Sequence, residues 1–343
     1  MNAVQTQPLV GLSTIDMAGI VEQLGHPIYR ARQMARWVYT ANCRSFDQMT
    51  DLPASLRSLL EEKFQIEAIK LYLKQESADG TIKCLVELSD KEQVECVLLP
   101  FKDRTSVCLS SQVGCAMGCH FCATAQLGAG RNLTPGEIVD QLLLMQSLSS
   151  SRISHVVFMG MGEPMLNFDN VLTSIRLMNK EIGIGMRRMT ISTVGIVPRI
   201  LDLAKEKLQI TLAVSLHAPN DELRKSLMPV AKKWSIAELL DACRSYFAQT
   251  GRRVTFEYLL LKGINDQAEH ADQLAGLLKG FPCLVNLIPF NFVRTDLNFQ
   301  RPGSSQVRLF RDKLTEKGIE TTQREEKGHD IAAACGQLKG SRL

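Results

Sequence analysis

From about residue 104 onwards the sequence alternates between β-strand and α-helix patterns, and no other feature constrains the fold so strongly. Short apolar runs such as "ITLAVSLHA" are separated by amphipathic segments such as "TPGEIVDQLLLMQSL". In the second of these, Thr134 is placed to cap a helix, with Pro135 at its first position and Glu137 at its third. Six such strand–helix units in series predict a parallel sheet with right-handed crossovers, and therefore an α/β fold.

Polar and glycine-rich residues follow most of the predicted strands. A barrel brings the carboxyl ends of its strands together around one mouth, where its functional site lies. We therefore predict a partial (βα)6 barrel and not a doubly wound sheet. Its mouth would gather Cys115, Cys119, Cys122, Glu163, Ser192, Ser215, His217 and Asn291.

The chain before the barrel divides into two further parts. Residues 1–66 have helical periodicity and predict a small helical module. Residues 67–103 read as three strands, with Asp79-Gly80 as a hairpin turn, and predict a β meander that links the module to the barrel. The barrel would then occupy residues 104–343.

The net charge of +4 is unevenly distributed, with −3 over residues 1–100 and +7 over the rest. The helical module nevertheless contains a stretch, "GHPIYRARQMARWVYTANCR", in which arginines alternate with aromatic residues. Such a surface suits RNA, through phosphate contacts and base stacking. An amphipathic helix with a solvated basic face explains the same pattern.

Two classes of protein are not expected from this composition. No apolar run has the length needed to span a bilayer, and the first basic residue is Arg30, so neither a membrane protein nor a secretory signal is predicted. We expect a cytoplasmic protein. Ten cysteines in such a chain indicate reduced thiols that take part in metal or redox chemistry.

Three of these cysteines fall within eight residues, in "CAMGCHFC" at 115–122. Three thiolates can hold three irons of a [4Fe-4S] cluster, in which a fourth iron stays open to a ligand. The alternative is zinc, with His120 or a remote residue as the fourth ligand. The position of the run, directly after the first barrel strand, favours the iron–sulfur cluster.

The run has the form C-x-x-x-C-x-aromatic-C, with Phe121 as the aromatic residue, and resembles the radical S-adenosylmethionine (SAM) superfamily. Further stretches are similar, in order and spacing, to the RlmN/Cfr family of RNA adenine methyltransferases. They are "MGMGEPMLN", "ISTVGIVP", "SLHAPND", "NLIPFN" and "DIAAACGQL". The resemblance covers most of the chain and implies a radical-SAM barrel with a [4Fe-4S] cluster and SAM as cofactors.

The resemblance also implies roles for residues at the barrel mouth. Gly162 and Glu163 would hold the amino end of SAM. The remaining SAM contacts would be Ser192, Ser215, Leu216, His217 and Asn291. Taken without the resemblance, the same residues fit a tight turn, side-chain hydrogen bonds to local backbone and a core histidine.

Three residues outside the mouth motifs would carry the chemistry, as the resemblance implies. Cys335 accepts a methyl group from one SAM, and a radical derived from a second SAM activates it. Cys108 resolves the adduct by forming a disulfide with Cys335, and Glu95 accepts the proton. Without the resemblance these would be a buried cysteine, a core strand cysteine and a solvent-facing strand residue. We expect the remaining cysteines to be structural: Cys43, Cys84, Cys96, Cys243 and Cys283.

The activity implied is methylation at C2 of an adenosine in the peptidyl-transferase region of 23S rRNA, and of the adenosine 3′ of the anticodon in tRNA. A monomer and an external electron donor such as flavodoxin are also expected. The stretch "TTQREEKGHDIAAACGQL" departs from the usual RlmN form, so Cfr-like C8 methylation is an alternative. Two others are a radical-SAM enzyme with a different substrate and a zinc-stabilised RNA-binding protein.

Overall fold

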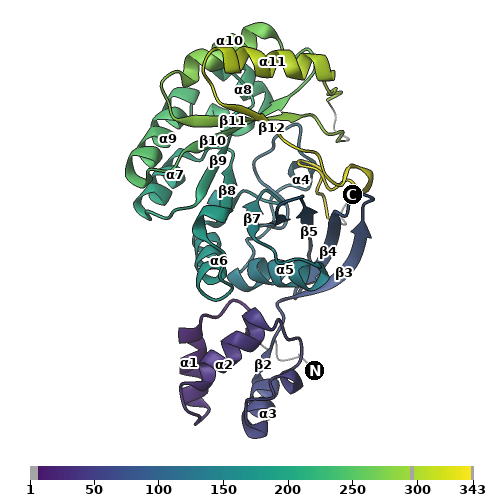
Figure 1. Ribbon diagram of the computed structural model, residues 1–343, viewed down its shortest axis with the longest axis vertical. Helices are drawn as coiled ribbons and strands as arrows, with labels where there is room; N and C mark the ends of the chain where they lie inside the picture. The colour runs from purple at the N-terminus through teal and green to yellow at the C-terminus, as the bar shows by residue number, and fades with distance from the viewer. Residues whose placement is uncertain (1–6, 294–296, 341–343) are drawn as a thin grey trace.

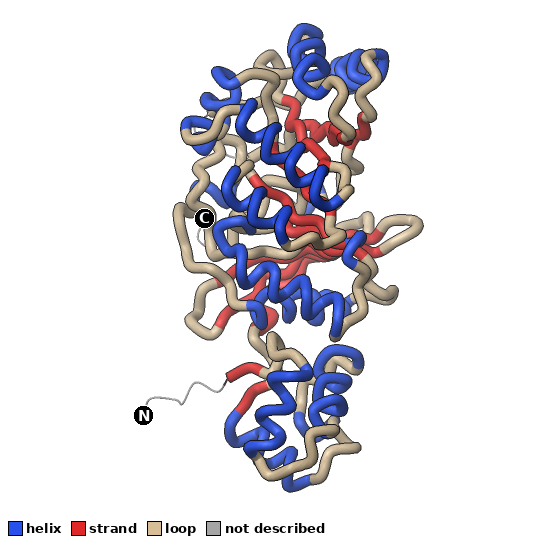
Figure 2. The backbone as a smooth tube through the Cα atoms, turned by 90° about the vertical axis from the view of Figure 1, so that its left-hand side faces the viewer, coloured by secondary structure: helices blue, strands red, loops and turns tan. Residues whose placement is uncertain are grey.

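A computed structural model describes residues 7–293 and 297–340 of the chain. A small helical lobe, formed by the N-terminal residues, lies at one end of a larger α/β body (Figures 1 and 2). The outermost residues of the first and last predicted domains, 1–6 and 341–343, lie outside the described residues. No helix in the described part of the chain has the length and apolarity needed to cross a membrane.

The body is built on one ten-stranded sheet with the order β12-β11-β10-β9-β8-β7-β6-β5-β4-β3. The seven strands from β6 to β12 are parallel to one another. Their bounds are β6 Thr105–Cys108, β7 His155–Phe158, β8 Met189–Thr193, β9 Thr211–Ser215, β10 Val254–Leu260, β11 Cys283–Pro289 and β12 Thr321–Gln323. Strands β6 and β12 do not close on each other, so the predicted partial barrel is confirmed.

Helices form the crossovers between successive parallel strands and cover one face of the sheet (Figure 1). They are α5 Pro135–Leu148, α6 Phe168–Lys180, α7 Val197–Lys205, α8 Asp221–Leu227, α9 Ile236–Thr250, α10 Ala268–Leu278 and α11 Ser304–Glu316; a short helix, α4 Ala123–Gln126, precedes α5. Helix α5 begins as the sequence predicts, because Thr134 and Glu137 form a capping box and Pro135 follows the cap.

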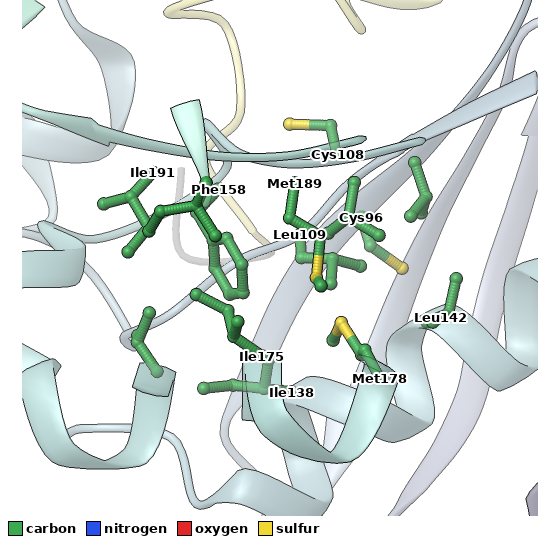
Figure 3. Packing of buried hydrophobic residues seen from close by; sticks show 14 of the residues in the cluster. Cys96, Cys108, Leu109, Ile138, Leu142, Phe158, Ile175, Met178, Met189 and Ile191 are labelled. Atoms are coloured by element: carbon green, nitrogen blue, oxygen red, sulfur yellow. The ribbon is translucent and has the colours of Figure 1, made fainter. Parts of the chain in front are cut away.

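The two faces of the parallel strands differ sharply in polarity. On the helix-covered face, Phe158, Met189 and Ile191 pack against Ile138 of α5 and Ile175 of α6 (Figure 3). The opposite face lines the barrel interior, and most of its residues are small or polar, although Val157 and Ile288 also lie there. Four of them are register partners on successive strands and form a row: Ser215, Glu257, Asn286 and Thr322. A polar interior of this kind leaves room for a ligand in place of a packed apolar core.

Three antiparallel strands extend the sheet beyond β6. They are β3 Ile69–Glu76, β4 Ile82–Leu88 and β5 Gln93–Pro100. The turn between β3 and β4 contains Gly80 at a φ of +81°, in agreement with the predicted Asp79-Gly80 hairpin. Because β5 pairs with β6, the predicted meander is a continuous part of the main sheet.

The N-terminal lobe, as far as it is described (from residue 7), contains the α-helices α1 Thr14–Gln23, α2 Arg30–Ala35 and α3 Ala54–Lys63, together with the short parallel pair β1 Gln7–Pro8 and β2 Phe64–Gln65. Two short helices, η1 Arg36–Thr40 and η2 Phe46–Gln48, lie between α2 and α3. The lobe is anchored to the body at α5. A Cβ on Gly11 would lie 2.7 Å from the Cα of Gly136, so the backbones are in close contact there.

Candidate active site

Two cavities meet inside the barrel. The smaller, about 130 Å³, lies at the carboxyl ends of the parallel strands and is bordered by Cys115, Cys119 and Cys122. The larger, about 1210 Å³, runs along the barrel interior towards the amino ends of the strands; it is called the lumen below. Cys335 borders both cavities.

The cysteine run forms a loop between β6 and α4 that glycines allow to fold tightly. Gly114, within this loop, has a φ of +77°, and a Cβ there would lie 2.4 Å from the carbonyl oxygen of Gly128, so only glycine fits. Cys119 is buried, and burial raises the pKa of the Cys115 thiol to about 12. A metal ion would offset this desolvation, because a coordinated thiol loses its proton.

The arrangement fits the cofactors that the sequence suggests. No three His, Cys, Asp or Glu side chains among the described residues converge on a single metal ion. A four-iron cluster does not require such convergence, because each cysteine binds a different iron. The carboxylate of Glu163 lies on the same cavity, and the buried Oδ1 of Asn291 has no hydrogen-bond partner within the described part of the chain. Both can serve a polar ligand.

Gly162 and Glu163 follow β7 and lie side by side at the small cavity. Gly162 has a φ of +99°, and a Cβ there would lie 2.6 Å from the Cβ of Gln112. The Glu163 carboxylate accepts hydrogen bonds from the backbone N–H groups of Val194 (2.8 Å) and Met165 (3.0 Å). Burial outweighs these bonds and raises the pKa of Glu163 to about 7. A cationic amino group nearby would favour the ionised form.

The ends of β8 and β9 bring Ser192, Ser215 and His217 to the same cavity, whereas the buried side chain of Leu216 does not line it. His217 has a φ of +57°, and its Nδ1 accepts a hydrogen bond from the backbone N–H of Leu259 at 3.0 Å. Burial, together with the charge of Arg224, lowers its pKa to about 3. The imidazole is therefore neutral. Because Nδ1 accepts the hydrogen bond from Leu259, the ring proton is on Nε2, at the opposite side of the ring.

The segment around Cys335 is held against the cysteine loop by two hydrogen bonds. The backbone N–H of Ala123 donates to the carbonyl of Gly336 at 2.8 Å, and the Thr124 hydroxyl donates to the carbonyl of Leu338 at 2.6 Å. Asn291 lines the lumen and donates through Nδ2 to the carbonyl of Cys335 at 3.4 Å. The structure thus brings Asn291 to Cys335, although it does not line the small cavity.

Cys108, the last residue of β6, lies on the lumen side of the sheet. Figure 3 shows its sulfur on the opposite side of the strands from Phe158 and Ile138. It borders the lumen together with Cys335, and both are free thiols. Burial raises the pKa of Cys108 to about 12, and the neighbouring Arg324 guanidinium opposes this effect.

Glu95 lies apart from both cavities. Its carboxylate accepts hydrogen bonds from the backbone N–H groups of Lys339 (2.7 Å) and Gly340 (3.2 Å), and Lys83 Nζ lies 3.3 Å from the other oxygen. The residue is buried, not solvent-facing as its position in the strand alone suggests. The C-terminal segment covers it.

Several polar residues at the site have no counterpart in the sequence predictions. The fully buried Arg224 donates to the carbonyls of Val194 (2.6 Å) and Ser215 (3.2 Å), and so joins the ends of β8 and β9. Glu257 and Arg324 border both cavities. Glu257 interrupts the apolar strand "VTFEYLLL". A charged residue in such a strand is costly to bury, so the sequence alone could have indicated Glu257 as a candidate site residue.

The arginines of the N-terminal lobe are mostly engaged within the protein. Asp51 binds Arg36 at 2.6 Å, and its backbone carbonyl accepts from Arg30 at 2.7 Å. Trp37 also donates to Asp51, at 2.5 Å. Much of the arginine–aromatic pattern therefore stabilises the lobe itself.

Two family models match the chain. The model described as the Radical SAM superfamily matches residues 109–275, and the one described as the Ribosomal RNA large subunit methyltransferase N-terminal domain matches residues 7–66. The first implies a [4Fe-4S] cluster and SAM as the cofactors, in agreement with the sequence prediction.

Relatives that match nearly the whole chain indicate the same family as these two models. A protein from Thermosynechococcus vestitus, named as a probable dual-specificity RNA methyltransferase RlmN, is 47% identical, with coverage of 98% of this chain and 99% of its own. A protein of the same name from Symbiobacterium thermophilum is 50% identical, with coverage of 97% and 91%.

The crystal structure of a radical SAM methyltransferase from Sphaerobacter thermophilus is similar over 97% of this chain and 99% of that one, with a TM-score of 0.93 and 43% identity. The relatives match both the helical lobe and the barrel, so the resemblance extends beyond the cysteine motif. This chain belongs to the RlmN family of radical-SAM RNA methyltransferases.

Proposed function

We propose that the protein methylates C2 of an adenosine in 23S rRNA, in the peptidyl-transferase region, and the adenosine 3′ of the anticodon in tRNA. The observation that supports this most directly is that Cys335 borders both the cysteine-lined cavity and the lumen. A thiol at that position can receive a methyl group on one side and present it to a base on the other. The named activity of the relatives, dual-specificity RNA methylation, supports the same substrates.

Cys115, Cys119 and Cys122 would hold the cluster, and Gly162, Glu163, Ser192, Ser215, Leu216, His217 and Asn291 would bind SAM. When bound, these cofactors supply the methyl group and the radical that activates it. Leu216 would contribute its backbone, because its side chain does not line the cavity. The neutral His217 can donate a hydrogen bond from Nε2 without adding charge.

The chain's own residues would complete the transfer. Cys335 would carry the methyl group as a thioether, and the radical from SAM would remove one hydrogen from it, after which its carbon would bond to the ring carbon of the base. The ring would then lose one electron, which the oxidised cluster would take back, and one proton, which Glu95 would accept. The Cys108 thiolate would attack the sulfur of Cys335, so that the carbon–sulfur bond breaks and the released carbon takes a proton to complete the methyl group. The methylated base is thereby freed, and the two cysteines are left as a disulfide. Cys108 and Cys335 border the same lumen, which supports this pairing.

The target base would enter the lumen from the amino ends of the strands. The rim there carries Lys102, Arg104, Arg152, Arg187 and Arg188, all exposed. Such a rim attracts the phosphates that flank a flipped nucleotide. The lumen is also large enough for a nucleoside, whereas the cysteine-lined cavity is much smaller.

Mass spectrometry of rRNA and tRNA nucleosides, after anaerobic incubation with protein, SAM and reductant, tests the proposal. We expect 2-methyladenosine in both RNAs. 8-Methyladenosine would indicate Cfr-like regioselectivity, and SAM cleavage without any methylated nucleoside would indicate another substrate. Flavodoxin as electron donor, a monomeric state and a cytoplasmic location complete the proposal. Replacing chemical reductant with flavodoxin and its reductase, and measuring the mass in solution, test the first two.

A further inference from the structure

A carboxylate and a guanidinium lie in the wall of the lumen beside Cys335 and do not neutralise each other. Glu257, on β10, is only 4% exposed, and Arg324 directly follows β12. Both border the lumen and the cysteine-lined cavity, as Cys335 does. Neither has an ion-pair partner within 4.0 Å among the described residues. The mechanism above uses neither of them.

The carboxylate is held in one orientation by the row of polar residues that crosses the sheet. Asn286 Nδ2 donates to Glu257 Oε2 at 2.8 Å, and the Thr322 hydroxyl donates to Asn286 Oδ1 at 3.0 Å. These three residues are register partners on β10, β11 and β12. Within the described part of the chain, the second oxygen, Oε1, accepts no hydrogen bond, and it is not among the fully buried atoms that lack a partner, so it is accessible to a ligand in the lumen.

The guanidinium is fixed at its base and keeps free donors at its end. The backbone N–H of Arg324 donates to the carbonyl of Leu287 at 2.9 Å, which continues the pairing of β11 with β12. Its Nη1 lies 3.1 Å from the sulfur of Met159. A guanidinium has five N–H donors, so most of them remain available to a ligand in the lumen.

Both charges act on the methyl-carrying thiol, which places them close to the reacting group. Burial raises the pKa of Cys335; Arg324 opposes this effect and Glu257 adds to it. Burial also raises the pKa of Glu257 itself, against the effects of Arg324 and the Asn286 hydrogen bond. A ligand that hydrogen-bonds to both side chains would relieve these unfavourable interactions.

We propose that Glu257 and Arg324 select adenine as the target base, a deepening of the proposed function on which it rests. The Glu257 carboxylate accepts a hydrogen bond from the exocyclic amino group, and the Arg324 guanidinium donates one to a neighbouring ring nitrogen. On both of its polar edges adenine presents this amino donor beside a ring-nitrogen acceptor. Guanine presents a carbonyl oxygen in place of the amino group, and this oxygen would face the carboxylate. The pair therefore accepts adenine and rejects guanine by repulsion.

The test compares a target RNA that carries adenosine with the same RNA that carries purine riboside, which lacks only the exocyclic amino group. The preference is measured in binding, by competition fluorescence anisotropy with the holoenzyme, and in methylation, as kcat/KM. For the native chain we expect a preference of about 10- to 100-fold for adenosine, the cost of leaving a buried polar group unpaired.

In Glu257→Leu the preference should fall below about threefold, because the acceptor is gone. Glu257→Gln keeps the shape and one acceptor oxygen, and should give an intermediate preference even if the leucine variant does not fold. Arg324→Gln should weaken binding and methylation of both RNAs equally and leave the preference unchanged, since both bases keep the ring nitrogens. Glu325→Gln removes an exposed carboxylate next to Arg324 that also borders the lumen, and is the matched control; its preference for adenosine should equal that of the native chain.

Methylation of Cys335 by SAM, read from the mass of its peptide, should be at least as fast as in the native chain in both Glu257 variants, which would assign their defect to engagement of the base. It should be slower in Arg324→Gln, because loss of the guanidinium leaves the pKa of Cys335 higher. Equal binding and methylation of the two RNAs by the native chain would overturn the inference and leave the proposed function intact. An unchanged preference in both Glu257 variants would also overturn it. Absence of methylated adenosine with the native chain would instead contradict the proposed function, while the binding preference would still decide the inference.

Discussion

The carboxylate of Glu95 accepts a hydrogen bond from the backbone N–H of Lys339 at 2.7 Å, and this contact holds the C-terminal segment against β5. Cys335 lies four residues before Lys339. The hydrogen bond to Lys339 therefore connects Glu95, the proposed proton acceptor, to the segment that carries the proposed methyl carrier. For Glu95 to reach a base in the lumen, Lys339 and Gly340 must release its carboxylate.

We predict that Glu95→Gln leaves methylation of Cys335 and cleavage of SAM intact but lowers the yield of methylated RNA. The amide keeps an acceptor for the N–H of Lys339 but cannot take a proton. A decrease of about 10²-fold or more is expected for the loss of a general base. Liquid chromatography of the nucleosides measures the yield, and Glu87→Gln, on the neighbouring strand β4, is the control. A normal yield would refute the role of Glu95.

A second prediction concerns pH. Burial raises the pKa of Glu163 to about 7, so in the free protein this carboxyl is protonated below that pH. A cationic amino group of SAM needs the ionised carboxylate. The affinity for SAM should therefore be highest between about pH 7 and 8 and fall below that range as Glu163 takes up its proton, approaching tenfold per unit, and it should fall again above about pH 8 as the amino group of SAM loses its charge. Calorimetric titration between pH 6 and 8.5 measures this, and Glu163→Gln should bind SAM weakly and without the decrease below pH 7. A native profile without this decrease would show that Glu163 does not bind the amino group.

The sequence predicts those features of this chain that depend on local chemistry. The capping box of Thr134 and Glu137, the hairpin at Gly80 and the alternation that produces the parallel sheet each involve residues close in the chain. The clustering of Cys115, Glu163 and Ser192 also follows, because carboxyl ends of parallel strands meet at one edge.

Contacts between distant segments could not be predicted in this way. Glu95 and Lys339 are separated by most of the chain, and nothing in either local pattern indicates the other. The arginine–aromatic stretch has the composition of an RNA surface, yet Asp51 engages Arg36 and Trp37 within the lobe. Composition shows which side chains could bind RNA, whereas tertiary packing decides which of them are already engaged within the protein.

A third prediction concerns the junction between the lobe and the body. Asp140, on α5, is fully buried and accepts hydrogen bonds from the backbone N–H of Ala68 (2.7 Å), the N–H of Ile69 (3.1 Å) and Arg44 (2.7 Å). Asp140→Ala leaves these donors unpaired and should lower the free energy of unfolding by about 2–4 kcal/mol. Urea denaturation measures the change.

The control for this junction is Glu67→Ala. Glu67 also pairs with Arg44, at 3.1 Å, but its side chain is 41% exposed. Solvent screens such a pair, so the change should be below about 1 kcal/mol. If the two variants were equally stable, Asp140 would not be the residue that joins the lobe to the sheet.

The fourth prediction concerns the rim of the lumen. Arg187 and Arg188 are exposed at the amino end of β8, where the proposed entry for RNA lies. The double variant Arg187→Gln/Arg188→Gln should bind target RNA more weakly, and the slope of log Kd against log salt should become shallower by about 1–2, one unit per lost phosphate contact. SAM cleavage should not change, because neither residue borders the cysteine-lined cavity. Arg244→Gln removes an exposed arginine on α9 that pairs with Asp241, and should leave the slope as it is. An unchanged slope in the double variant would show that RNA does not enter the lumen at this end of the barrel.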